Sequence, residues 1–239
     1  MNIFLDTNIW IYLTKSNYAP LWDKLNNGHY SLLTNDIIIE EWKRNKETTI
    51  KSVCDSIKNE YKTAQKLSQY LAKEDVDSYN AILSKYQKEE FRIQAAEKHV
   101  DEVEKLLLST QKVEITQEQI TDVAQMAIKK IAPLNTTKNN FNDALIIRSL
   151  IEFSQTEKVD VWSDYNVIFV SNNPKDFLDE NGNIHSELLK DSKDVSIKSV
   201  TELGEALQIS DEDDEEFDRW LEDMLDMEAM RQLEISLGK

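Results

Sequence analysis

The chain opens with a short apolar strand that ends in an acidic residue. Residues 3–5 are Ile, Phe and Leu, an unbroken run that suits a strand buried on both faces of a parallel sheet. Asp6 follows at once, and Thr7 or Asn8 can cap the helix that comes next. Ligands of open α/β sheets bind beyond the carboxyl ends of the strands. We therefore expect Asp6 to lie in such a crevice. The simpler alternative is that Asp6 is only a cap or turn residue.

Short apolar segments alternate with helical ones along the chain. Further strands are expected at residues 30–33, 167–170 and 195–197. Helices are expected after caps at Thr34 or Asn35, at Thr116 (a capping box with Gln119), at Asn142 and at Thr201, and a short one at residues 186–189. Four glycines and three prolines among 239 residues argue against an all-β fold. The pattern predicts an α/β domain with a central, mainly parallel sheet flanked by helices.

A long helical stretch interrupts this alternation. Between about residues 44 and 112, apolar side chains recur every three and four positions in two stripes. Residues 75–77 form the natural break between the stripes. We expect two long helices folded as an antiparallel hairpin, inserted into the α/β domain as an arm.

The last thirty residues are strongly acidic. Residues 210–239 hold twelve acidic and three basic side chains, so they carry −9 of the formal charge of −17 and leave −8 for the rest. Their apolar residues recur with helical spacing at Phe217, Trp220, Leu221 and Met224. We therefore predict an α/β domain at residues 1–207, containing the hairpin, and an acidic amphipathic segment at residues 208–239.

The chain has the composition of a cytoplasmic protein. Cys54 is the single cysteine, so no disulfide can form within the chain. No apolar run reaches the roughly 20 residues that a membrane span requires, and no signal region precedes the first strand. We expect a cytoplasmic location and no membrane contact.

Two more acidic residues occupy places comparable to that of Asp6. Glu41 lies near the start of the helix after the second strand, and Asp143 opens the helix after an amide-rich loop. The helix dipole alone explains an acid at either place. Converging carboxylates repel one another unless a cation neutralises them, and oxygen ligands favour Mg²⁺ or Mn²⁺. Two such ions about 3.5–4 Å apart can activate water and stabilise the leaving oxygen of a phosphodiester.

Four motifs resemble those of the PIN-domain family of metal-dependent ribonucleases. They are Leu5-Asp6-Thr7-Asn8, Ile38-Ile39-Glu40-Glu41-Trp42, Asp143-Ala144-Leu145-Ile146 and Phe169-Val170-Ser171-Asn172-Asn173. Their order and their positions after strands agree with the family over residues 1–43 and 115–207. The chain is most similar to the PIN-like subgroup with a helical insertion between the second and third acids. Lys138 and Ile184-His185 match further features of that subgroup.

The resemblance implies a three-layer PIN-like fold and an endoribonuclease that hydrolyses single-stranded RNA, as a toxin or in defence. It implies metal binding by Asp6, Glu41 and Asp143, with support from Asn8, Ser171 and Asn173. Many members carry an acid where this chain has Asn173, and Asp176 is the candidate for the missing carboxylate. If Asp176 cannot reach the site, the second metal ion binds weakly, so turnover is slow or RNA is bound without being cut.

The negative net charge does not exclude RNA, because local Lys and Arg side chains make phosphate contacts. Lys43, Arg44 and Lys138 are the candidates, although a solvated helix face explains these residues equally well.

Two other functions fit part of the sequence. A haloacid-dehalogenase-type phosphatase needs a second Asp at position 8, where this chain has Asn8. The second is a catalytically weak PIN-like scaffold that acts through protein partners bound to the hairpin or the acidic segment. The sequence is also compatible with a homodimer. Mn²⁺ titration distinguishes the scaffold from the nuclease.

Overall fold

The computed structural model describes most of the chain as two compact units. The described residues are 1–28, 30–134, 140–156, 165–173, 177–179, 184–189, 192, 195–215 and 218–219. One unit comprises Leu5–Ile115, and we call it the hairpin unit. The other comprises Met1–Phe4 and Thr116–Lys239, and we call it the split unit.

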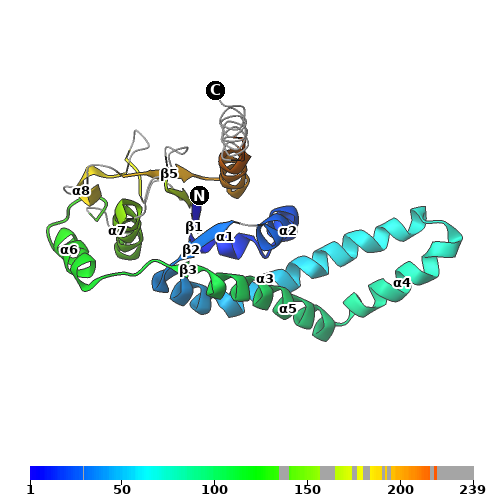
Figure 1. Cartoon of the computed structure of the whole chain (residues 1–239). Helices are drawn as coiled ribbons and strands as arrows, with labels where there is room; N and C mark the ends of the chain where they lie inside the picture. The colour runs from blue at the N-terminus through cyan, green and yellow to red at the C-terminus, as the bar shows by residue number, and fades with distance from the viewer. Residues whose placement is uncertain are drawn as a thin grey trace, which may run out of the picture. The chain divides into compact units, whose positions relative to one another are not determined.

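Five short strands form one sheet (Figure 1). They are β1 (Asn2–Leu5), β2 (Ser31–Thr34), β3 (Gln111–Lys112), β4 (Val167–Val170) and β5 (Ile197–Val200), in the order β3-β2-β1-β4-β5. β2 runs parallel to β3 with Leu33 opposite Gln111, and β4 runs parallel to β5 with Val167 opposite Ile197. Residues 3–5 and all of β4 are buried, as expected for strands of a parallel sheet. The predicted three-layer α/β class is confirmed.

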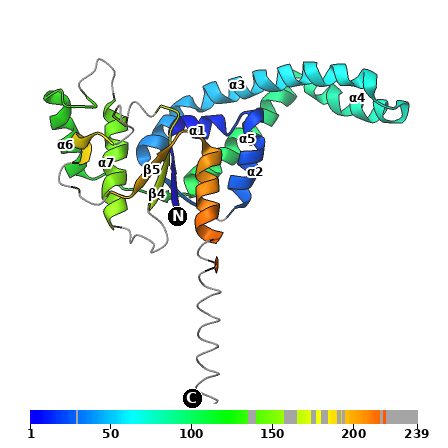
Figure 2. The ribbon, with the colours of Figure 1, turned by 90° about the horizontal axis from the view of Figure 1, so that it is seen from above.

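Helices make up most of the hairpin unit. They are α1 (Thr7–Tyr12), the 3-10 turn η1 (Ser16–Tyr18), α2 (Ala19–Asn27), α3 (Asp36–Leu67), the 3-10 turn η2 (Ser68–Tyr70), α4 (Lys73–Gln87) and α5 (Glu89–Ser109). α3 and α4 form the arm seen in Figure 2, and α5 packs along α3. Ala96, Val100 and Val103 on the packed face of α5 are fully buried. The helix that starts at Asp36 therefore continues unbroken into the hairpin.

The predicted break at residues 75–77 is wrong. The turn lies at η2, and Glu74 and Asp75 belong to the first turn of α4. The helix dipole favours acids in a first turn, so this acidic cluster marks the start of a helix rather than a break.

A second break, which was not predicted, divides the returning limb of the hairpin at Lys88. Neither Gly nor Pro marks this place in the sequence. The Arg92 guanidinium instead donates hydrogen bonds to the carbonyl oxygens of Tyr86 and Gln87, both at 2.8 Å. These bonds satisfy carbonyl groups that have no partner inside α4 at its end.

The split unit carries the remaining helices. They are α6 (Gln117–Ile128), α7 (Phe141–Thr156), α8 (Ser186–Leu189) and a helix over residues 203–215. Thr116 caps α6 and forms the predicted capping box with Gln119. α6 packs on α7, whose inner residues Leu150 and Ile151 are fully buried.

Two predicted boundaries near the end of the sheet are wrong. The last strand covers Ile197–Val200 instead of residues 195–197, because the backbone N–H groups of Asn166 and Val167 both reach the carbonyl oxygen of Ser196. This register starts the ladder later and buries Val200. The following helix begins at residue 203, so Thr201 does not cap it.

None of the helices in the described ranges is long and apolar enough to cross a membrane. The apolar stripe predicted for the acidic segment lies outside the described residues, and the boundary at residue 207 stays a prediction.

Candidate active site

Asp6 lies where β1 ends and α1 begins. Its side chain is 7% exposed, and its Oδ1 accepts a hydrogen bond from the backbone N–H of Thr7 at 2.7 Å. Asp6 therefore caps α1, and the expected caps Thr7 and Asn8 lie inside the helix instead. Asn8 is exposed. A carboxylate has about four lone-pair sites, so a capping role is compatible with metal binding.

Glu41 contacts Thr7, the first residue of α1, although 34 positions separate Thr7 and Glu41 in the sequence. Thr7 is 2% exposed, and its hydroxyl donates a hydrogen bond to Glu41 Oε2 at 2.9 Å. The backbone around Glu41 is held by its buried neighbours Ile39 and Trp42. Asp6 and Glu41 are thus joined through one residue. From its sequence Thr7 is expected only as a helix cap, and the one signal for its contact with Glu41 is a hydroxyl directly after the acid.

The start of α3 follows the predicted pattern. Asn35 caps the helix, because its Oδ1 accepts a hydrogen bond from the Ile38 N–H at 3.0 Å. One turn further on, Lys43 donates to exposed Glu40 at 2.8 Å, and this bond raises the pKa of Lys43. Arg44 is exposed. Lys138, the third candidate for phosphate contacts, lies outside the described residues.

Asp143 lies in the first turn of α7 and is half-buried. The helix already begins at Phe141, so Asn142, the expected cap, is its second residue. The next four residues, 144–147, are buried and fix this end of the helix in the core of the split unit.

Ser171 shapes the chain at the end of β4. It is 1% exposed, and its N–H donates to the carbonyl oxygen of Val200 at 3.1 Å. Its Oγ accepts a hydrogen bond from the backbone N–H of Asn173 at 3.2 Å, a local turn typical of Ser and Thr. Asn173 is half-buried. Asp176 lies outside the described residues.

The donor set suits a hard divalent cation. Asp6 and Glu41 offer carboxylate oxygens in the hairpin unit, and Asp143 offers another in the split unit. Within the described ranges, no group of three or more His, Cys, Asp or Glu side chains is arranged to hold a metal ion. Asp6 and Glu41 both contact Thr7, and the convergence of these acids with Asp143, Ser171 and Asn173 stays a prediction.

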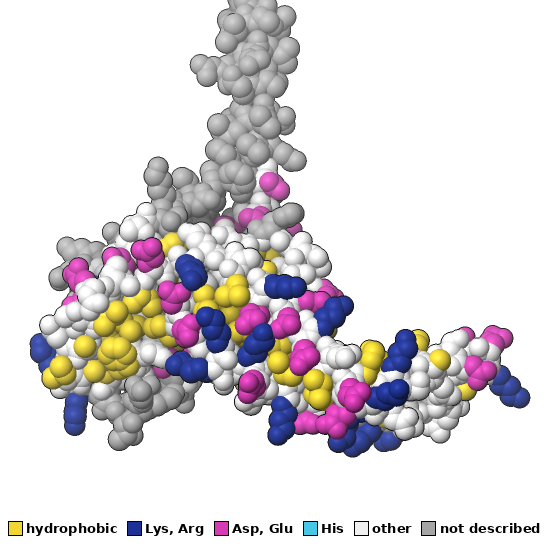
Figure 3. All heavy atoms as spheres, turned by 90° about the horizontal axis from the view of Figure 1, so that it is seen from below, with side chains coloured by type: hydrophobic (Ala, Val, Ile, Leu, Met, Phe, Trp, Pro, Cys, Tyr) yellow, Lys and Arg dark blue, Asp and Glu magenta, His cyan; other side chains and the backbone are white. Residues whose placement is uncertain are grey.

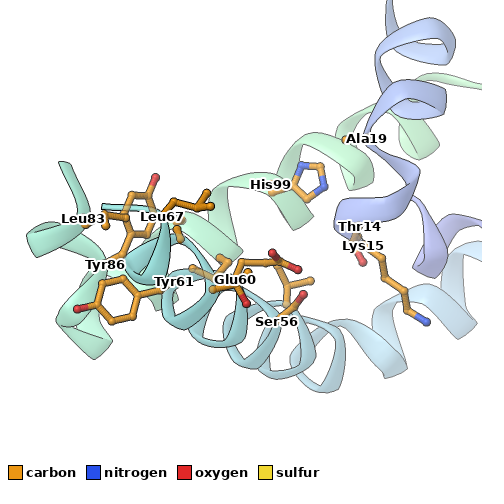
Figure 4. Close-up of a pocket in the computed structure, with 15 residues that line it drawn as sticks. Thr14, Lys15, Ala19, Ser56, Glu60, Tyr61, Leu67, Leu83, Tyr86 and His99 are labelled. Carbon is orange, nitrogen blue, oxygen red and sulfur yellow. The ribbon is translucent and has the colours of Figure 1, made fainter. Parts of the chain in front are cut away.

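A cavity of about 510 Å³ lies elsewhere in the hairpin unit (Figure 4). Its walls come from α3, α4, α5 and the segment after α1, and Ser56, Leu83 and His99 are among the lining residues. None of the predicted site residues lines this cavity. It contributes nothing to the chemistry expected of the acids.

The comparisons with known proteins identify the family. A family model described as PIN domain matches residues 3–177, a span that contains Asp6, Glu41, Asp143 and Ser171. No curated protein and no solved structure gives a significant match. PIN domains are generally metal-dependent nucleases. Because the match covers well over half of the 239 residues, the chain belongs to the PIN-domain family.

Proposed function

We propose that this protein is a metal-dependent endoribonuclease that hydrolyses single-stranded RNA, as a toxin or defence nuclease. The observation that carries the proposal is the pairing of Asp6 and Glu41 through Thr7, within the span that matches the family. Two acids from distant parts of the chain contact the same residue, one at its backbone N–H and the other at its hydroxyl. Converging carboxylates repel one another, and a divalent cation bound between them offsets that repulsion.

Each site residue has a proposed role. Asp6, Glu41 and Asp143 hold Mg²⁺ or Mn²⁺, with Asp176 or Asn173 completing the set. When bound, the cation supplies Lewis-acid stabilisation of the phosphodiester and a water nucleophile at neutral pH. Ser171 orients a ligand or water, and the exposed Asn8 amide hydrogen-bonds the substrate. Lys43, Arg44 and Lys138 contact phosphates away from the cut bond.

The proposed organisation follows the sequence. Residues 1–207 hold the catalytic residues. The acidic segment 208–239, whose first residues continue the helix over 203–215, binds a protein partner or keeps RNA from binding loosely. We place the protein in the cytoplasm.

The test is cleavage of an end-labelled single-stranded RNA by the purified full chain. We expect internal cuts with Mg²⁺ or Mn²⁺, no cuts with EDTA, and recovery when Mn²⁺ is restored. Glu41→Gln should abolish cleavage, because the amide removes the negative charge. Glu40→Gln is the matched control, since Glu40 is the adjacent acid but pairs with Lys43 on the surface.

Cleavage that persists in EDTA contradicts the proposal. Equal activity of the Glu41→Gln and Glu40→Gln variants contradicts the assignment of Glu41. If the wild-type protein neither binds Mn²⁺ nor cuts RNA, the scaffold function replaces the nuclease.

A further inference from the structure

Thr7 contacts both Asp6 and Glu41, each through a different group. Its backbone N–H donates to Asp6 Oδ1 at 2.7 Å, and its hydroxyl donates to Glu41 Oε2 at 2.9 Å. The direction of the second bond follows from chemistry, because an ionised carboxylate only accepts. The hydroxyl is buried, and buried polar groups are almost always hydrogen-bonded.

We propose that Thr7 is a positioning residue that orients Glu41 for metal binding. This inference rests on the proposed function. Thr7 acts through Glu41 and does not itself touch the metal or the RNA. Its hydroxyl holds one carboxylate oxygen, which restricts the rotation of the Glu41 side chain and leaves the other oxygen for the cation.

The surrounding structure makes Thr7 suitable for this task. Thr7 is the first residue of α1, and α1 packs on α3. The neighbouring Trp10 on α1 and Trp42 on α3 are almost completely buried, so both ends of the Thr7–Glu41 bond are attached to rigid backbone. Residues that orient a metal ligand typically change metal affinity by about 10–100-fold when they are removed.

The test compares Mn²⁺ affinity by calorimetry in the full chain. Thr7→Val keeps the side-chain shape and the bond to Asp6 but removes the hydroxyl, so we expect the dissociation constant to rise by about 10–100-fold. Thr7→Ser restores the hydroxyl and should bind like the wild type. Thr7→Ala is a second variant without a hydroxyl, for use if the valine variant does not fold.

Thr49→Val is the matched control for burial. Thr49 is 5% exposed, and its hydroxyl donates only within α3, to the Asn45 carbonyl oxygen at 2.9 Å. The same substitution there should leave Mn²⁺ affinity unchanged. The double variant Thr7→Val with Glu41→Gln should bind no more weakly than Glu41→Gln alone, because Thr7 acts through Glu41.

The outcomes separate this inference from the proposed function. If the wild type does not bind Mn²⁺, both are overturned. If the wild type binds Mn²⁺ and Thr7→Val binds equally well, only the role of Thr7 is overturned. The role is also overturned if Thr49→Val weakens binding as much, or if the Thr7 and Glu41 substitutions have additive effects.

Discussion

Asn35 shows how one buried side chain sets the place of a proposed metal ligand. It lies directly after β2, is fully buried, and caps α3 through its bond to the Ile38 N–H. The cap fixes the residue at which α3 begins, and Glu41 follows in its second turn. A short polar side chain after a buried strand is therefore needed for the geometry of the site as well as for stability.

We predict that Asn35→Ala lowers the free energy of unfolding by about 0.5–2 kcal/mol, because the N–H of Ile38 loses its acceptor. Asn35→Ser keeps an acceptor and should lose less. Chemical denaturation of the two variants measures the difference. Equal losses in both would show that the cap contributes little.

Lys46 forms ion pairs between two helices of the hairpin, α3 and α5. It donates from α3 to Asp101 at 2.8 Å and to Glu104 at 2.6 Å on α5, and its side chain is 29% exposed. The bond to Asp101, followed by the bond to Glu104, raises the pKa of Lys46 above 10.5. On the face seen in Figure 3, basic and acidic side chains are interspersed along the hairpin. The Lys46–Glu104 pair is partly buried, with side chains 29% and 20% exposed.

The ion pairs of Lys46 predict how the stability of the fold depends on pH. A raised pKa means that the folded state favours the charged form, so the stabilisation is fully present below 10.5 and is lost as pH rises through the folded-state pKa. Lys46→Gln should lower the free energy of unfolding by about 1 kcal/mol at neutral pH. Denaturation across pH should show this difference shrinking above 10.5.

Lys43→Gln is the control, because Lys43 pairs with Glu40 on the exposed surface. Solvent screening weakens such a pair, so this substitution should change the free energy of unfolding much less than Lys46→Gln at every pH. A constant difference between wild type and Lys46→Gln at high pH would contradict the assignment.

The elements that the sequence predicts well are those with strong local signals. Ile3-Phe4-Leu5, the Thr116–Gln119 capping box and the Asn35 cap each carry their own chemistry, and each lies where it was expected. The break at Lys88 depends on Arg92 reaching back to two carbonyl groups, and no composition rule reveals that contact. The late start of β5 depends likewise on pairing with a strand elsewhere in the chain.

For the candidate site too, the sequence predicts the residues that carry local signals and does not predict their tertiary contacts. The sequence predicts Asp6 and Glu41 from their places after strands, whereas the Thr7–Glu41 hydrogen bond is a tertiary contact. Thr7 was missed because a helix cap explained a threonine there equally well. The hydrogen bond between Ser171 and Asn173 is a short-range contact that a local sequence pattern can indicate. The bond from the Ser171 N–H to the Val200 carbonyl oxygen is long-range, and no local pattern indicates it.

The whole molecule carries a formal charge of −17, and the acidic segment should affect how it binds RNA. Residues 216–239 contain seven acidic side chains. Replacing these with Asn and Gln should strengthen single-stranded RNA binding at low salt, because repulsion of phosphates is removed. The gain should vanish near about 0.5 M salt, where the Debye length is only a few ångström. Fluorescence anisotropy measures both conditions, and an unchanged affinity at low salt would show that the segment does not oppose RNA.

The proposed function assigns Asp6, Glu41 and Asp143 to the same cation. Asp143→Asn in the split unit removes a charge while preserving shape, and Glu118→Gln is its control, an acid in the first turn of α6 in the same unit. The measurement is Mn²⁺ titration by calorimetry, with a melting curve for each variant.

We predict that Asp143→Asn weakens Mn²⁺ binding by about tenfold or more. Its melting point should be unchanged or higher, because metal-free carboxylates then repel less. Glu118→Gln should bind Mn²⁺ like the wild type. The contradicting result is unchanged Mn²⁺ affinity in Asp143→Asn together with a loss of about 0.3–1 kcal/mol in stability, as expected for an acid that serves only the helix dipole.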